Sequence, residues 1–150
     1  MSDVPDLPVT FRPTLTRAIL LTAGVLILLV ISGVGMLLDI GPGERLSFVV
    51  TGALICYVLT RIARVKVVAD DSGVTVVNIA TRRRLDWAEI LQVNLRPGDP
   101  WVFLDLSDGT SLAALGIQPG MSRERAIADA RTLRALVEQR SVHHPQGRQG

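Results

Sequence analysis

The chain has 150 residues, of which 16 are lysine or arginine and 14 are aspartate or glutamate, so its formal net charge at pH 7 is only +2. This small positive excess is spread along the chain and not gathered in one stripe, which argues against a nucleic-acid-binding protein. Hydrophobic residues make up 48% of the sequence, and its mean hydropathy is positive. The chain combines a high hydrophobic content with many charged residues. This combination indicates that the hydrophobic residues are concentrated in one part of the chain.

The N-terminal stretch, residues 1–14, reads MSDVPDLPVTFRPT and contains three prolines in polar surroundings. Such a composition predicts a flexible, partly extended leader without visible chemistry.

Two apolar runs follow, and together they predict a transmembrane helical hairpin over residues 15–63. The first, AILLTAGVLILLVISGVGMLL at 18–38, has no charge and as a helix spans about 31 Å, close to the roughly 30 Å of a bilayer core. It is longer than the apolar region of a signal peptide, and no small-x-small cleavage site follows it. The second, LSFVVTGALICYVLT, extends to residue 63 because Arg61 and Arg64 can bury their methylene stems, giving a span of 46–63. Gly41, Pro42 and Gly43 break the helix between the runs.

Charge at the ends of the spans predicts the orientation of the hairpin. Basic residues precede the first span and follow the second, namely Arg12, Arg17, Arg61, Arg64 and Lys66, whereas the connecting turn has Arg45 with Asp39 and Glu44. The positive-inside rule therefore predicts a multi-pass protein of the cell membrane with both termini in the cytoplasm. We expect Arg17, Arg61 and Arg64 to anchor the membrane ends of the helices. The alternative, two buried helices of a soluble protein, requires a polar stripe that neither run has.

Small residues are frequent in both spans, and the single cysteine, Cys56, lies among them. Small residues let helices approach closely in lipid, so they pack the hairpin on itself or dock it onto another membrane protein. Cys56 is interpreted as a packing residue, because it has no cysteine partner in the chain.

After the hairpin the pattern becomes alternating, and residues 64–141 are predicted to form a small antiparallel β domain. The stretch VKVVADDSGVTVVNI gives two strands around a turn at residues 70–73, and RRRLDW gives a third with Leu85 and Trp87 on one face. ILQVNLR predicts a strand that buries Leu91, Val93 and Leu95, and WVFLDLSDGTSLAAL predicts two more, with Val102, Leu104 and Leu106 buried. These are six strands. A turn or bulge is expected near Ala88 and Glu89, since a straight strand would bury the Glu89 carboxylate.

An amphipathic helix is predicted from Ser122 to Arg140, with Ser122 as its cap and an apolar stripe of Ile127, Ala130, Leu133 and Val137. Arg123, Arg125 and Arg131 are expected on its solvated side. Residues 142–150 are polar and are predicted to be a disordered tail.

The search for chemistry yields no catalytic, cofactor-binding or metal-ligating residues. The two histidines, His143 and His144, are adjacent and lack the spaced partners of a metal or catalytic site. The stretch DDSG lacks the ligand spacing of a calcium loop. The protein is therefore predicted not to be an enzyme and to need no cofactor.

The run Arg82, Arg83, Arg84 is the sharpest cluster of charge in the chain. Near a membrane, Lys66, Arg82 and Arg84 could contact anionic lipid. The other interpretation is a solvated strand edge, since alternation sends Arg83 to the face opposite Arg82 and Arg84.

In the order of its parts the chain resembles the bacterial PH-domain membrane proteins of actinobacterial type, the family of the low molecular weight protein antigen 6 PH domain. The resemblance covers roughly residues 12–141 and rests on the hairpin followed by DDSGVTVVNIATRRRLDWAEI, RPGDPWVFLDLSDGTSLAALGIQPG and SRERAIADARTLRALVEQR. It implies an α+β membrane protein: a two-helix transmembrane hairpin, then a small PH-like antiparallel β-sheet or partial barrel with a C-terminal amphipathic helix.

Two features depart from that pattern. The PH fold has seven strands, so one is hidden, and residues 65–70 and 88–95 are the expected places. The first hairpin loop, where phosphoinositide-binding PH domains have basic residues, has Asp70, Asp71 and Ser72, which repel inositol phosphates.

These features predict a non-enzymatic integral membrane protein whose cytoplasmic PH-like module acts as a scaffold or accessory subunit for other membrane or envelope proteins. The alternative is a module that binds anionic lipid headgroups through basic residues of the PH-like domain. The expected partners are membrane lipid and other membrane proteins, an oligomer is possible, and nucleic acid is not expected.

Overall fold

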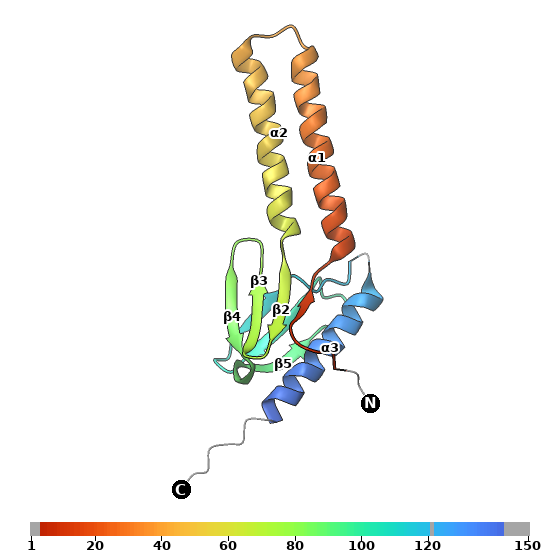
Figure 1. Cartoon of the computed structure of the whole chain (residues 1–150), viewed down its shortest axis with the longest axis vertical. Coiled ribbons are helices and arrows are strands. Elements are labelled where there is room, and N and C mark those ends of the chain that lie inside the picture. The colour runs from red at the N-terminus through yellow and green to blue at the C-terminus, as the bar shows by residue number, and fades with distance from the viewer. Residues whose placement is uncertain (1–3, 121, 143–150) are drawn as a thin grey trace. The chain divides into compact units, whose positions relative to one another are not determined.

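The computed structural model describes residues 4–120 and 122–142, which form two compact units (Figure 1). One unit is the continuous helical stretch Thr14–Arg64. The other combines the residues before Thr14 with those from Val65 onward. The second unit is therefore assembled from two pieces of chain that the first unit separates in the sequence.

The helical unit consists of α1 (Thr14–Leu37) and α2 (Pro42–Ala63), which run antiparallel in Figure 1. Both helices are long and apolar enough to cross a membrane, and little of either apolar stretch is buried. Each begins four residues before the span predicted from the sequence. At the turn between them, Pro42 occupies the first helical position, and the Glu44 carboxylate accepts a 3.0 Å hydrogen bond from the Gly41 N–H.

Glycines bring the two helices together. Gly24, Gly35 and Gly52 are buried in the helical unit. A Cβ at residue 52 would lie 3.3 Å from the Leu28 Cα, and one at residue 35 would lie 2.7 Å from the Phe48 Cβ. These glycines pack the hairpin on itself, as one of the two sequence interpretations required. Gly33 differs, because apart from its chain neighbours and the nearby backbone of its own helix, no heavy atom of the described residues lies within 4 Å of its Cβ position.

The other unit contains two antiparallel sheets, a short 3₁₀ helix η1 and one long helix. The first sheet has the order β1 (Val9–Phe11), β2 (Lys66–Asp70), β3 (Gly73–Val77), β4 (Arg82–Asp86), and the second has the order β5 (Ile90–Asn94), β6 (Val102–Leu106), β7 (Ser111–Ala114). The 3₁₀ helix η1 is Trp87–Glu89, and the C-terminal helix α3 is Arg123–Val142. This is the α+β arrangement that the sequence predicted.

The prediction of a flexible leader over residues 1–14 is wrong for Val9–Phe11. These residues form β1, which pairs with β2 so that Val9 lies opposite Ala69 and Phe11 opposite Val67. The Phe11 side chain is 5% exposed and belongs to the core. The seventh strand of the PH-like fold thus lies before the hairpin, and not at residues 65–70 or 88–95. The strand has only three residues and lies between prolines at 8 and 13, so the sequence pattern did not indicate it.

The segment after β4 turns as expected. Leu85 is buried, and so is Trp87, the first residue of η1. At the end of η1 the Glu89 carboxylate accepts a 2.7 Å hydrogen bond from the Asp86 N–H. The prediction for Leu91 is wrong, because this side chain is 66% exposed. A bulge between Ile90 and Gln92 leaves Leu91 without a partner on β6. The extra residue interrupts the alternation of buried and exposed side chains along β5.

One hydrophobic core joins both sheets to α3, which contributes Ala126, Ala130, Leu133, Leu136 and Val137. Val102, Leu104 and Leu106 are buried as predicted. Ile127, expected in the same stripe of α3, is only half-buried. The helix extends to Val142, two residues beyond its predicted end, and the remainder of the predicted tail lies outside the described residues.

Candidate contact surfaces of the domain

Lys66 and Arg82, two of the three predicted lipid contacts, lie in one row across the first sheet. Val77 of β3 lies between them, opposite Lys66 of β2 and opposite Arg82 of β4. Residues directly opposite one another share a face of the sheet, and both basic side chains are exposed. The structure therefore places two positive charges on one face, two strands apart.

Arg84 lies on the same face but is engaged by other residues of the domain. Its guanidinium donates to the Asp70 carboxylate at 3.1 and 3.3 Å and to the Thr75 hydroxyl at 3.3 Å, and it also bonds the Ser72 hydroxyl. Arg83 points to the opposite face, as alternation predicted, and forms a 3.6 Å ion pair with Asp108. The lipid contact proposed for Arg84 has no test in the structure, but these bonds compete with it.

The acidic turn between β2 and β3 is internally bonded. The Asp70 carboxylate accepts hydrogen bonds from the Ser72 hydroxyl at 2.7 Å, the Ser72 N–H at 2.9 Å and the Gly73 N–H at 3.0 Å. These bonds, with the nearby Arg84 charge, hold the pKa of Asp70 below its ordinary value. The turn stays anionic at neutral pH, which disfavours phosphate binding at this loop.

The two ends of the first sheet differ in charge. Phe11, where β1 ends, pairs with Val67 at the start of β2, so the chain leaves and re-enters the sheet at the same end. Lys66 and Arg82 lie at that end, while Asp70 lies at the other end of β2. Each connection to the helical unit is two residues long, Arg12–Pro13 and Arg64–Val65. The positive row therefore lies at the end of the sheet that carries both connections.

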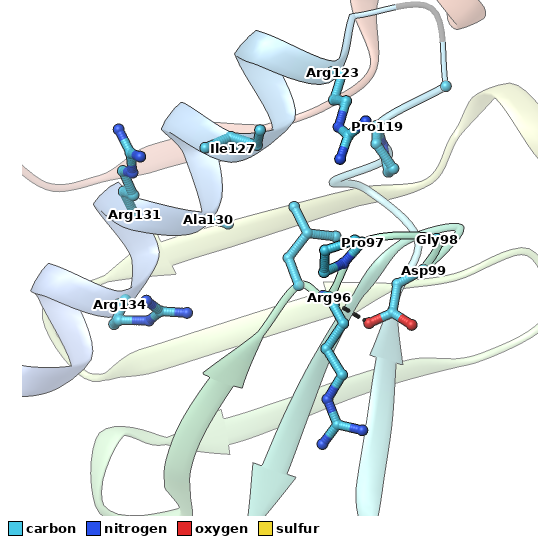
Figure 2. A pocket seen from close by; sticks show the side chains of 12 residues that line it. Arg96, Pro97, Gly98, Asp99, Pro119, Arg123, Ile127, Ala130, Arg131 and Arg134 are labelled. Atoms are coloured by element: carbon cyan, nitrogen blue, oxygen red, sulfur yellow. Dashed lines mark hydrogen bonds between the residues drawn. The ribbon is translucent and has the colours of Figure 1, made fainter.

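A groove of about 510 Å³ lies on the domain between α3 and the turn that joins β5 to β6 (Figure 2). Apolar and basic side chains line it, among them Leu95, Pro97, Pro119, Ile127, Ala130, Arg96, Arg123, Arg131 and Arg134, with Asp99 as the one acidic residue. The Asp99 carboxylate accepts a 2.8 Å hydrogen bond from the Arg96 N–H, so it shapes the turn. Its single negative charge leaves the lining with a formal net charge of +3.

Sequence reasoning missed this groove. Arg123 and Arg131 are exposed, as predicted for the solvated side of the helix, but the sequence does not indicate that they line a groove with Arg134. Arg123 and Arg134 are eleven residues apart, which is three helical turns, so they share a face of α3 with Ile127 and Ala130 between them. The spacing of the two arginines can be read from the sequence. The opposite wall of the groove cannot, because the turn after β5 is distant from α3 in the sequence and lies beside it only in the folded domain.

The remaining predicted positions are separate from these surfaces. Cys56 packs beside Gly24, whose Cβ position is 3.5 Å from the Cys56 Sγ, as a packing residue would. Arg17 lies in α1 near its start, Arg61 in the last turn of α2 and Arg64 at its C-cap, and their role as membrane anchors stays a prediction. Across residues 4–120 and 122–142, no group of three metal-ligating side chains occurs, and His143 and His144 lie outside this range.

Comparison with known families identifies the domain. The family described as the bacterial PH domain matches residues 64–136, which run from just before β2 into α3. Those residues are therefore similar to that family, in agreement with the resemblance seen in the sequence. The matched range begins after β1 and the helices, so the first strand of the sheet lies outside it.

The chain is also similar along most of its length to mycobacterial proteins. An uncharacterized protein of Mycobacterium bovis and one of Mycobacterium tuberculosis are each 25% identical to it over 139 residues, covering 88% of this chain and 90% of theirs. No solved structure matches the chain significantly.

Proposed function

From the bacterial PH domain of residues 64–136 and the two apolar helices before it, we propose a non-enzymatic plasma-membrane protein that presents this domain to other membrane proteins on the cytoplasmic side. The domain acts as a scaffold or accessory interaction module.

The observation that carries the proposal is the position of the hairpin between two paired strands. Phe11 and Val67 are neighbours in one sheet, and both helices lie between them in the sequence. Strands on opposite sides of a membrane cannot pair, so two spans between β1 and β2 return the chain to its starting side. The basic residues near the helix ends, Arg17, Arg61 and Arg64, support the cytoplasm as that side.

The two connections between the domain and the helices are short. Three Cα steps separate Phe11 from Thr14, and three separate Ala63 from Lys66, so each connection reaches at most about 11 Å. Such a tether keeps the domain beside the membrane and raises its effective concentration for partners there, so that weak contacts suffice.

The test is co-purification from native membranes in mild detergent, with the Phe11→Asp variant as the control. Phe11 is a core residue of the domain, so an unpaired charge at this position is expected to unfold the domain and leave the hairpin intact. The wild-type chain should recover membrane proteins that the variant loses. Recovery of none by the wild type, or equal recovery by the variant, would contradict the proposal, as would a C-terminal tag accessible to protease from outside the cell.

A second candidate function, binding of anionic lipid headgroups, is favoured by the row of Lys66 and Arg82 at the end of the sheet with both connections. Each basic residue near an anionic leaflet contributes about 1 kcal/mol of attraction. In nanodiscs, a thiol introduced by Thr81→Cys in a Cys56→Ala background should react more slowly in phosphatidylglycerol than in phosphatidylcholine. Equal rates, or a difference that survives Lys66→Gln with Arg82→Gln, would count against this function.

A further inference from the structure

We propose that the groove between α3 and the β5–β6 turn binds an extended acidic segment of a partner protein, in which an apolar side chain lies between carboxylates. This inference rests on the proposed interaction function and names the chemistry of the partner.

The face of α3 that lines the groove has a charged–apolar–charged order. Arg123 and Arg134 are eleven residues apart, which places their Cα atoms about 16 Å apart along the helix and nearly on one line. Ile127 and Ala130 occupy the interval between them. Figure 2 shows the side chains of Arg123 and Arg134 directed toward the groove, whereas that of Arg131 extends along the outer side of the helix.

The opposite wall is largely apolar. Leu95, Pro97 and Pro119 face the middle of α3 across a cavity of about 510 Å³. This volume lies within the range of ligand sites, and an apolar wall with a few fixed polar groups is the usual composition of such sites. An apolar side chain of a bound segment would be enclosed between this wall and Ile127.

The positive charge of the groove is available to a ligand. Within residues 4–120 and 122–142, Arg96, Arg123 and Arg131 have no carboxylate within ion-pair distance. Arg134 donates one 2.8 Å hydrogen bond to the Val93 carbonyl, which fixes its position and leaves its other N–H groups for a ligand. Guanidinium groups bind carboxylates with two parallel hydrogen bonds.

The spacing of the charges favours a peptide over a lipid headgroup. Because Arg134 is held at the β5 strand, it is not free to move toward Arg123, and one phosphate would contact only one of the two. An extended chain rises about 3.3 Å per residue, so five residues cover the 16 Å between them. Two acidic positions about five residues apart, with an apolar residue between, match this face of the helix.

The experiment measures binding of a labelled decapeptide to the full chain in phosphatidylcholine nanodiscs by fluorescence anisotropy. The probe carries two glutamate pairs five residues apart around a leucine, and a second probe has lysine in place of glutamate. The acidic probe should bind with a Kd that rises with salt, and the basic probe should not bind. Arg123→Gln and Ile127→Ser should each weaken binding at least fivefold.

The matched control is Arg83→Gln, which removes the same charge from an exposed residue of β4 outside the groove and should change the Kd less than twofold. Failure of the acidic probe to bind the wild type would overturn the proposal, as would an equal loss with Arg83→Gln. The groove would instead be assigned to lipid under two conditions. Phosphatidylglycerol in the nanodiscs would abolish binding of the acidic probe, and Arg123→Gln would leave the lipid contacts of the rest of the domain unchanged.

Failure of this proposal is distinguishable from failure of the proposed function. If the Arg123→Gln chain recovers from native membranes the same proteins as the wild type, the interaction module stands and the groove is not its site. If the wild type recovers none, the interaction function itself fails.

Discussion

The two units of this chain use hydrophobic residues in opposite ways. In the domain, the largest fully buried side chains are leucine, isoleucine and valine, whereas in the hairpin leucines such as Leu29 are exposed and glycines lie between the helices. A soluble core gains stability by removing large apolar side chains from water. Helices in lipid have no such gain from burying them, so close backbone approach at small residues stabilises their packing. This contrast is what the proposed insertion of the hairpin into lipid predicts.

The largest expected effect tests this contrast with two apolar residues near the N-terminus. Phe11→Ala should lower the free energy of unfolding of the domain by about 3 kcal/mol, because Phe11 is 5% exposed in the core. Leu29→Ala should change it by less than about 0.5 kcal/mol, because Leu29 is 62% exposed on α1. Thermal unfolding in detergent, followed by the fluorescence of the two tryptophans, both of which lie in the domain, measures this. Equal effects of the two changes would contradict the expected difference between the two units.

A smaller effect is expected inside the hairpin. Gly35→Leu places a side chain against Phe48, so overpacking should destabilise the helix pair by about 1–3 kcal/mol. Gly33→Leu is the matched control, two residues earlier, and should be tolerated. Helix content during titration with a denaturing detergent, measured by far-UV circular dichroism, reports the difference. If both variants behave alike, the glycine contacts between α1 and α2 do not stabilise the hairpin.

The smallest effect concerns the acidic turn of the domain and depends on pH. The lowered pKa of Asp70 means that the folded state binds its proton less tightly than the unfolded state. Its contribution to stability is therefore complete above pH 3.8, the ordinary value, and is lost as the pH falls through the lower folded pKa. Asp70→Asn should slightly lower the Tm at pH 7, and its difference from wild type should narrow below pH 3.8. A difference that is constant with pH would assign the effect to the turn geometry alone.

The elements with strong periodicity were predictable from sequence. Continuous apolar runs gave both helices of the hairpin, and alternation gave six of the seven strands and the inward faces of Val102 and Leu104. These patterns are local, so the sequence contains them in full.

The errors fall where tertiary pairing decides. β1 has three residues and becomes a strand only because β2, more than fifty residues later, provides its partner. The exposure of Leu91 depends on a bulge opposite β6, which no local pattern records. The groove beside α3 likewise joins Arg123 to a turn that precedes it by more than twenty residues. Each of these features requires contacts between distant parts of the chain.

The position of the hairpin between β1 and β2 has a consequence for biogenesis. During synthesis β1 leaves the ribosome well before its partner strand. In the proposed topology, β1 pairs with β2 only after both helices have been inserted. A chain inserted with only one span would separate the two strands by the bilayer and leave Phe11 without the core it belongs to. In the proposed topology, the sheet can therefore be completed only in a chain with both helices inserted.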